Sequence, residues 1–447
     1  MKVLFVAPPV DYPKVNVNIG SELGILNLVA QVKKHCKVQV DFYSFEYAKL
    51  VPPRYTIEEL FSVFQPNIIC ISVLTHSYPF AKQISKAAKE RGCIVIWGGI
   101  FVSQKGAEIL NDLNYVDYYI TGEGELSLPK LIDNISLKID SFRLNIPVNK
   151  IFQPKSYDSF HNCALPDYSI IPSELISKHN LRATLETSRG CKFSCEFCSL
   201  NNLNYNQKDK GMSRIESELV NISALGFQKI LICDNNFLLE SKTLTEFYNC
   251  KQEVAPDIKL RITIRLDLID LPLLKRFRSL GVDEIIIGIE HVDDNILSSM
   301  KKTAFNGNSW QKMAEEKITL AADMGFLVHP IFMFGWPEET PFSIEKNKIV
   351  ACKLGSHVNI EPFVAFITPH PGNNVESFIT QAKIKRITSD YSKYIHLYPV
   401  AVPISFDKKN ILQLIEAHNE IRTISNMTYR NPCISPEFVF SYSDLIN

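Results

Sequence analysis

The segment TSRGCKFSCEFCSL, Thr187–Leu200, decides how the chain is interpreted. It follows a predicted strand and contains three of the chain's eleven cysteines, Cys191, Cys195 and Cys198, in a Cys-x3-Cys-x2-Cys spacing. Thiolates so close in sequence can bind one metal centre. A structural zinc ion takes four protein ligands, and no nearby Cys or His pair in the sequence supplies the fourth. Three thiolates instead suit a 4Fe–4S cluster that leaves one iron open to a substrate or cofactor.

Length and composition are those of an ordinary globular protein. The 447 residues allow two or three domains, and 46% of them are hydrophobic and 21% charged. Lys+Arg and Asp+Glu are both 48, and this neutral balance gives no electrostatic reason to expect nucleic acid or an anionic membrane as partner. The apolar run near the N-terminus is too short for a signal-peptide core or a membrane span. We therefore expect a cytoplasmic protein without a membrane span.

Residues 1–136 alternate predicted strands and helices, and the strands are almost continuously apolar. This pattern predicts a parallel sheet covered on both faces, that is, a doubly wound (Rossmann-like) α/β domain. Ligands of such domains bind at the carboxyl ends of the strands. A dinucleotide is not expected, because no G-x-G-x-x-G follows the first strand. Strands are expected at 2–8, 38–44, 68–74, 93–99 and 116–125, and helices at 20–35, 56–66, 78–92 and 126–135.

After a linker at 137–180, a second alternation runs from 181 to 382. Its six strand–helix units are too few for an eight-fold barrel and predict a partial (β/α)6 TIM-type barrel. A C-terminal extension, 383–447, contains one expected helix at 406–424. The barrel strands are expected at 182–188, 229–234, 259–265, 284–290, 327–335 and 358–369, and the helices near 213–225, 240–252, 270–280, 292–325 and 341–353.

Over about residues 1–380 the sequence resembles the radical S-adenosylmethionine (SAM) superfamily, and within it the group with an N-terminal cobalamin-binding domain. The octapeptide CKFSCEFC, residues 191–198, is similar to the superfamily's cluster motif, including the aromatic Phe197. The resemblance implies that Cys191, Cys195 and Cys198 hold a 4Fe–4S cluster. It also implies that the amino and carboxylate groups of SAM chelate the open iron.

Further segments resemble the parts of this family that bind SAM. The turn ICDNNF (232–237) is similar to an acidic turn beside SAM, and the segment 264–302 to the family's third and fourth strands. The resemblance implies that Arg265 faces the SAM carboxylate and that Glu290 accepts hydrogen bonds from the ribose. FMFGWPEET (332–340) would lie near adenine, and FITPHPGN (366–373) would help to close the site. The alternative for each residue is a strand-end polar group satisfied by backbone. The expected SAM contacts are Phe197, Asp234, Asn236, Arg265, Glu290, Gly335 and Thr368.

Small and hydroxylated residues follow several strands of the first domain, where related enzymes bind cobalamin. The D-x-H-x-x-G motif that supplies a histidine to cobalt in other cobalamin proteins is absent, and His76 is expected to be an ordinary loop histidine. The sequence therefore does not identify the axial ligand of the cobalt. Ordinary tight turns are the alternative explanation of the glycines. The resemblance implies that the corrin and its nucleotide tail contact Ser72, Thr75, Gly98, Gly99, Gly122 and Gly124.

The resemblance implies a reaction as well as a fold. SAM would be cleaved reductively at the cluster, with flavodoxin or ferredoxin as electron donor, to a 5′-deoxyadenosyl radical that abstracts hydrogen from a small-molecule substrate. Methylcobalamin would then methylate the carbon. The alternatives are radical dehydration, dehydrogenation, cyclisation or ring rearrangement without methyl transfer, and a cobalamin-binding sensor module. The sequence identifies neither the substrate nor a catalytic residue.

The positions of the cysteines argue against one related activity. The methylthiotransferases of tRNA need three more cysteines in the first domain for a second cluster. Cys36, Cys70 and Cys93 are present there but are not expected in the loops after the strands. They are expected to be buried small side chains, as are the scattered cysteines elsewhere, and a disulfide framework is not expected.

Overall fold

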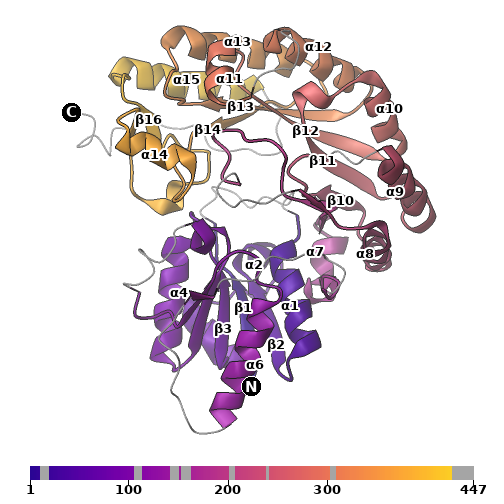
Figure 1. The fold of residues 1–447 in the computed structure, drawn as a ribbon, viewed down its shortest axis with the longest axis vertical. Coiled ribbons are helices and arrows are strands. Elements are labelled where there is room, and N and C mark those ends of the chain that lie inside the picture. Colours follow the sequence, from indigo (N-terminus) through magenta and orange to yellow (C-terminus); the bar gives the residue numbers. More distant parts are fainter. Residues whose placement is uncertain are drawn as a thin grey trace. The chain divides into compact units, whose positions relative to one another are not determined.

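The computed structural model describes residues 1–10, 20–104, 113–140, 151–152, 163–200, 207–237, 241–302 and 309–424. The chain divides into two compact units (Figure 1). The first comprises residues 1–184 and 210–227, and the second comprises 185–209 and 228–447.

The first unit contains the expected parallel sheet. Its strand order is β2-β1-β3-β4-β5-β6, and every pairing is parallel. The order changes direction between β1 and β3, which makes the sheet doubly wound and confirms the predicted fold class. The strands are β1 (Lys2–Ala7), β2 (Gln39–Ser44), β3 (Ile68–Ser72), β4 (Ile94–Gly98), β5 (Tyr118–Ile120) and β6 (Ile151–Phe152).

Helices of this unit begin and end at residues that the sequence favours. Thr56 and Glu59 form the capping box of α3, with Glu59 N donating to Thr56 Oγ1 at 3.2 Å and Thr56 N donating to Glu59 Oε2 at 2.8 Å. Pro79 lies in the first turn of α4, and Gly92 follows its end with φ +75°. The helices are α1 (Leu23–His35), α2 (Phe45–Leu50), α3 (Ile57–Phe64), α4 (Tyr78–Glu90), α6 (Ser127–Asp140), α7 (Ser173–Ser177) and α8 (Met212–Ala224), with a 3-10 turn η2 (Tyr168–Ile170).

Both faces of this sheet are buried. Val3, Phe5 and Ile96 pack with α1 and α6 on one face. On the other, Trp97 is fully buried and donates from Nε1 to Ser85 Oγ of α4 at 2.8 Å. The alternation of side chains along a strand explains why these strands are apolar throughout.

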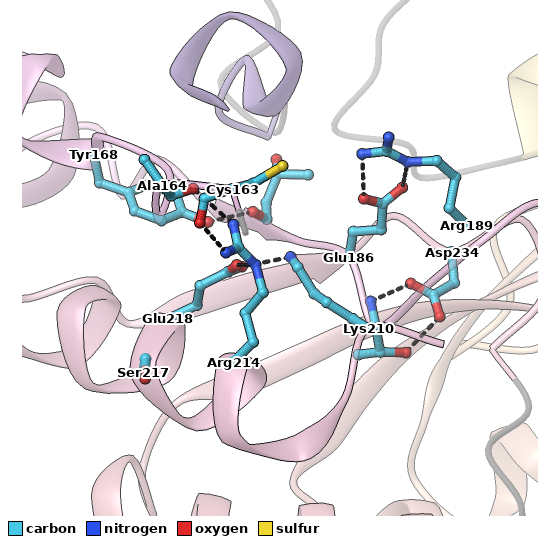
Figure 2. Close-up of polar contacts among 12 residues, drawn as sticks. Cys163, Ala164, Tyr168, Glu186, Arg189, Lys210, Arg214, Ser217, Glu218 and Asp234 are labelled. Atoms are coloured by element: carbon cyan, nitrogen blue, oxygen red, sulfur yellow. Dashed lines mark hydrogen bonds and ion pairs between the residues drawn. The ribbon is translucent and has the colours of Figure 1, made fainter. Parts of the chain in front are cut away.

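A buried charge network fastens the segment before α7 to α8 (Figure 2). Arg214 donates from Nη1 to Cys163 O at 2.6 Å and from Nη2 to Ala164 O at 2.7 Å. The carboxylate of Glu218, which has no exposed surface, accepts from Lys210 Nζ at 2.7 Å. Breaking such a buried pair by removing one partner is strongly destabilising, so we assign the network a structural role.

The sheet order β14-β13-β12-β11-β10-β7 follows the chain, and the strands from β10 to β14 pair in parallel. These six strands confirm the predicted partial barrel. Figure 1 shows α9, α10, α12 and α13 along one side of the strands. The strands are β7 (Ala183–Leu185), β10 (Lys229–Ile232), β11 (Lys259–Arg265), β12 (Val282–Glu290), β13 (Leu327–Phe334) and β14 (Phe363–Phe366).

The remaining elements lie between these strands or after them. The helix expected over 292–325 is two helices, α11 and α12, and residues 303–308 between them lie outside the described ones. The helices are α9 (Ser241–Val254), α10 (Leu271–Ser279), α11 (Asp294–Ser299), α12 (Trp310–Asp323), α13 (Pro341–Gly355), α14 (Asn374–Thr380) and α15 (Lys408–Ile424), with 3-10 turns η4 (Leu266–Leu268) and η5 (Tyr391–Lys393). Two antiparallel strand pairs join β8 (Ser188–Arg189) to β9 (Lys208–Asp209) and β15 (Ile384–Arg386) to β16 (Ala401–Pro403).

The two faces of the barrel strands differ in exposure. On β12, Ile285, Ile287 and Ile289 are fully buried, whereas Ile286 and Gly288 between them are only half-buried. On β11, β13 and β14 the half-buried positions are fewer, namely Thr263, Leu327, Ile331 and Phe363. The fully buried face is the one that helices cover, and the half-buried face is the inner side of the barrel. Solvent therefore reaches the inner face between its side chains.

The C-terminal extension contributes packing to the barrel end. The expected helix is α15, which contacts α13 through Gln413 Nε2, a donor to Pro341 O at 3.0 Å. Ile384 and Ala401 of the β15–β16 pair join a hydrophobic cluster with Trp336 and Ile367, and Phe197 packs against that cluster. Among the described residues, no helix is both long and apolar enough to cross a membrane.

Candidate functional site

The cysteine loop lies at the carboxyl end of β7. Gly190 begins the loop in the left-handed region, with φ +92°, and the N–H of Cys198 donates to Cys195 O at 3.0 Å. Cys195 is buried, and Cys191 and Cys198 are half-buried. Burial raises the pKa of the Cys195 and Cys198 thiols. Within the described ranges, no three Cys, His, Asp or Glu side chains are arranged around a common metal position. The structure thus brings the three thiols into one short loop without converging them on a point.

Arg265, at the end of β11, contacts this loop directly. Its Nη1 donates to Cys195 Sγ at 3.2 Å, and its guanidinium lies 4.0 Å from the centre of the Phe193 ring. Asp267 fixes the guanidinium through two hydrogen bonds, at 3.0 Å to Nε and 3.1 Å to Nη2. The backbone N–H of Arg265 donates to Asn236 Oδ1 at 3.0 Å. Arg265 is therefore oriented beside Cys195, and Asn236 orients the strand end. That Arg265 faces the SAM carboxylate stays a prediction.

Asp234 has a structural task that accounts for its position. Its buried carboxylate, drawn in Figure 2, accepts from Thr187 N at 2.7 Å and from the Thr187 hydroxyl. It also accepts from Ser188 Oγ at 2.8 Å. Desolvation raises the pKa of Asp234 against these hydrogen bonds. In the same segment Arg189 pairs with Glu186 at 2.9 Å. Asp234 thus ties the end of β10 to the start of the cysteine loop, and the alternative of a satisfied strand-end group describes it well.

Glu290 ends β12 in a strained conformation, with φ +65°. Lys302 Nζ donates to Glu290 Oε1 at 2.6 Å, and both side chains are buried. The same Nζ lies 5.7 Å from the centre of the Phe197 ring. The sequence analysis missed Lys302. The two consecutive lysines Lys301 and Lys302 carry no pattern that distinguishes the buried one from its exposed neighbour, which pairs with Glu196 at 2.6 Å.

Gly335 and Thr368 follow the next two strands. Gly335 has φ +92°, and its N–H donates to Glu339 Oε2 at 2.5 Å. A Cβ at Gly335 would lie 2.7 Å from Ile367 Cγ2, so only glycine fits this turn. Thr368 is buried, and its hydroxyl donates to Phe366 O at 3.1 Å. The two residues therefore lie on neighbouring turns, and Thr368 Oγ1 already has a backbone partner.

Two histidines that the sequence analysis did not select lie at the end of β14. His370 Nε2 and His396 Nε2 are 3.1 Å apart, and His396 O accepts from Phe366 N at 2.8 Å. His396 has φ +61°. His396 is exposed to solvent. These residues add polar groups to the same end of the barrel.

The residues expected at cobalamin lie along the carboxyl ends of β3, β4 and β5. Ser72 is the register partner of Gly98. A Cβ at Gly99, which has φ +97°, would lie 2.7 Å from Val73 O. This glycine is therefore required by its own sheet whether or not a ligand binds. Gly122 also has a positive φ, +69°, and donates from N to Ser103 Oγ at 2.8 Å.

Thr75 and Gly124 complete this edge. Thr75 is buried, and a Cβ at Gly124 would lie 3.1 Å from Leu28 Cδ2. The fold brings the six residues to neighbouring strand ends, where a doubly wound domain binds ligands. The contacts of these residues with cobalamin stay predictions.

The first unit does not assemble a second cysteine cluster from its described residues. Cys36 caps the end of α1 and donates to Pro129 O at 3.3 Å, and Cys93 directly precedes β4 and donates to Pro66 O at 3.1 Å. Cys70 lies within β3, and burial raises its pKa. All three are buried, as expected, and none lies at the carboxyl end of a strand.

Two family models match the chain. Residues 185–347 match the radical SAM superfamily, and residues 17–132 match the B12 binding domain. The chain is a radical SAM enzyme with a cobalamin-binding domain. Its cofactors are a 4Fe–4S cluster, SAM and cobalamin.

Relatives of this radical SAM enzyme extend over most of its length. It is 23% identical over 437 residues to an uncharacterized methyltransferase of Pyrococcus horikoshii, a match that covers 93% of this chain and 91% of the other. It is 24% identical to the hopanoid C-3 methylase of Methylococcus capsulatus, covering 88% and 74%. It is also 25% identical to the anaerobic magnesium-protoporphyrin IX monomethyl ester cyclase of Cereibacter sphaeroides, covering 78% and 58%.

A solved structure has the same fold as this radical SAM enzyme. The methyltransferase TsrM of Kitasatospora setae, with cobalamin and a [4Fe-4S] cluster bound, superposes with a TM-score of 0.67. The match covers 98% of this chain and 94% of TsrM, at 14% identity. At this identity the likeness shows the fold, which agrees with the predicted sheet domain and partial barrel.

Proposed function

We propose that this radical SAM enzyme methylates an unactivated carbon of a small molecule. The observation that carries the proposal is that the cysteine loop and a cobalamin-binding sheet occur in one chain, in an order that relatives named as methyltransferases match along most of their length. When bound, the reduced cluster and SAM supply the radical that removes hydrogen from the substrate, and methylcobalamin supplies the methyl group. The tasks of the protein are binding, orientation and exclusion of water.

The side chains at the end of the barrel suit these tasks. Cys191, Cys195 and Cys198 would hold the cluster. Arg265 keeps a fixed positive charge at 3.2 Å from Cys195 Sγ, where a carboxylate of SAM would be attracted. Glu290, oriented by Lys302 at 2.6 Å, would accept hydrogen bonds from the ribose. The other expected SAM contacts would be Phe197, Asp234, Asn236, Gly335 and Thr368.

The inner face of the barrel is the proposed substrate surface. Ile286, Ile331 and Phe363 are half-buried there, whereas their neighbours on the outer face are covered by helices. Solvent access to this face would admit a small molecule, and its apolar side chains lie beside charged ones such as Arg261 and Glu284. Bound substrate and cofactors would then have to exclude water, because water would quench a radical. A flavodoxin or ferredoxin is the proposed electron donor.

The residues at the carboxyl edge of the first unit fit a large flat ligand. Ser72, Thr75, Gly98, Gly99, Gly122 and Gly124 are short and would let the corrin and its tail approach the backbone. Because the D-x-H-x-x-G motif is absent, we propose that no histidine of that motif ligates cobalt.

Radical ring closure without methyl transfer is the second candidate. The cyclase relative favours it, since its match covers 78% of this chain. Product mass separates the two reactions: a gain of one CH2 supports methyl transfer, whereas a loss of hydrogen or water supports cyclisation or dehydration.

The decisive experiment is anaerobic reconstitution with iron, sulfide and hydroxocobalamin, followed by incubation with SAM labelled in its methyl group and a strong reductant. Formation of 5′-deoxyadenosine together with label on cobalamin supports the proposal. Formation of 5′-deoxyadenosine without labelling of cobalamin would favour ring closure. A protein that binds cobalamin but leaves SAM intact would be a sensor.

A further inference from the structure

A buried histidine and a buried glutamate join the turns after β12 and β13. His291 has no exposed surface and Glu339 is 2% exposed. His291 Nε2 lies 3.3 Å from Glu339 Oε1. Burying a carboxylate is costly unless hydrogen-bond donors surround it. The burial of this pair at the end of the barrel therefore needs a structural reason.

Backbone N–H groups donate hydrogen bonds to the outer ends of the pair. The backbone N–H of Asp293 donates to His291 Nδ1 at 2.9 Å, which requires a lone pair on Nδ1. In the neutral ring the proton is then on Nε2, the nitrogen that lies 3.3 Å from Glu339 Oε1; this is an ion-pair contact without hydrogen-bond geometry. On the far side, Glu339 Oε2 accepts from Gly335 N at 2.5 Å. One continuous chain of polar contacts thus runs from the backbone of one turn to the backbone of the other.

Each turn that the pair joins holds an expected contact of SAM. His291 directly follows Glu290, whose φ of +65° is strained for a residue with a side chain. Gly335, at φ +92°, is fixed by Glu339 itself. The first turn would face the ribose and the second the adenine.

A second bridge joins the same two segments. Trp336 Nε1 donates to Ser299 Oγ at 2.7 Å, and Ser299 Oγ lies 3.2 Å from Glu338 Oε2. The bridge connects α11 to the turn after β13. Asp293 caps α11, because its side chain accepts a hydrogen bond from Asn295 N at 3.0 Å. The buried pair and this outer bridge make the two turns one mechanical unit.

We infer that His291 and Glu339 are positioning residues that couple the ribose-facing turn to the adenine-facing turn, so that the nucleoside end of SAM is bound by both turns together. Neither side chain needs to touch SAM. The inference rests on the SAM contacts proposed above for Glu290 and Gly335. Since the pair joins the two turns proposed to contact the ribose and the adenine, it should govern the nucleoside and leave the iron-chelating methionine end unaffected.

Two substitutions separate this role from a general effect on folding. His291→Asn keeps an acceptor near the position of Nδ1 for Asp293 N–H but cannot reach Glu339. Glu339→Gln keeps the shape and an acceptor for Gly335 N–H but turns an amide toward His291 Nε2. His418→Asn is the matched control, because His418 is also buried, at 1% exposed, and stacks on Phe366 in the same unit.

The test measures the binding of 5′-deoxyadenosine, methionine and SAM to the enzyme reconstituted with cluster and cobalamin, by isothermal titration calorimetry. We expect both variants to bind 5′-deoxyadenosine and SAM about tenfold more weakly and methionine as the wild type does, as the loss of one buried polar contact predicts. The double variant should be no weaker than either single one. His418→Asn should lower thermal stability without changing affinity.

Glu290→Gln serves as the reference for the proposed contact. If it weakens 5′-deoxyadenosine binding while both pair variants bind normally, the inference is wrong and the SAM assignment stands. If Glu290→Gln has no effect, the ribose contact is wrong and the coupling inference fails with it. Neither result bears on methyl transfer, which is read from labelled cobalamin. Should one pair variant fail to fold, the other decides.

Discussion

Arg265 donates a hydrogen bond from Nη1 to the sulfur of Cys195, at 3.2 Å. This contact joins the end of β11 to the cysteine loop and puts a permanent cation beside a proposed cluster ligand. Asp267 and the Phe193 ring hold the guanidinium on two further sides. The orientation of the Arg265 guanidinium is therefore fixed by its protein neighbours, because Nε, Nη1 and Nη2 each have a partner.

Replacing Arg265 by lysine should weaken SAM binding about tenfold, since an ammonium keeps the charge but cannot contact Asp267 and Cys195 together. Titration of the reconstituted enzyme with SAM measures this. Arg278→Lys is the control, because Arg278 is exposed on α10 and lies over Phe326 at 5.1 Å. Equal affinities for SAM in the wild type and the Arg265 variant would remove Arg265 from the site.

Substituting alanine for Cys191, Cys195 or Cys198 should abolish the absorption near ~400 nm that thiolate-ligated clusters give. Bound iron should fall with it, as measured by chemical analysis after anaerobic reconstitution. Cys352→Ala, a half-buried cysteine on α13, should keep both signals. Four irons retained per chain in the three loop variants would contradict the cluster assignment.

Much of the fold followed from patterns local to each segment. Six barrel units, the capping box of α3 and the glycine after α4 are set by residues a few positions apart. The candidate site residues were selected because they end strands in a recognisable order. Asp234 was selected in this way, although its hydrogen bonds to Thr187 and Ser188 give it a structural task that no spacing reveals.

Other features depend on distant partners and escaped prediction. Lys302 is buried because Glu290 needs a cation, yet next to it Lys301 is exposed. The strands β15 and β16 are too short to show an alternating sequence pattern. Their apolar residues Ile384 and Ala401 pack instead with Trp336 and Ile367. The break between α11 and α12 was missed because both helices share one periodic stretch. Tertiary packing decides such cases.

The first unit should have a pH-dependent stability traceable to Glu22. Desolvation raises its pKa from 4.5 to about 7, against a hydrogen bond from Ser44 Oγ at 2.6 Å. Between these pH values the folded state binds more protons at Glu22 than the unfolded state, so its contribution to stability falls as pH rises from about 4.5 to 7.

Urea unfolding of the wild type and Glu22→Gln at pH 5 and pH 8 tests this. The amide cannot ionise, so the variant should gain stability relative to the wild type at pH 8 and not at pH 5. A difference between the two proteins that is the same at both pH values would contradict the raised pKa. Asp41→Asn, on β2, is the control, and it should give no comparable change between the two pH values.

Gly288 should be intolerant of a methyl group because of the pair above it. A Cβ at this position would lie 2.4 Å from Glu290 Oε1 and 2.8 Å from Lys302 Nζ, so the two side chains must separate or move. Gly288→Ala should therefore weaken SAM binding by about tenfold or more, while the cluster absorption stays. Gly24→Ala is the matched control: its Cβ meets nothing within 4 Å, it lies in α1, and alanine should stabilise that helix by up to about 1 kcal/mol. Calorimetric titration with SAM and thermal denaturation of both variants measure the two effects. If Gly288→Ala bound SAM as tightly as the wild type, the Glu290–Lys302 pair would have no part in holding the ribose.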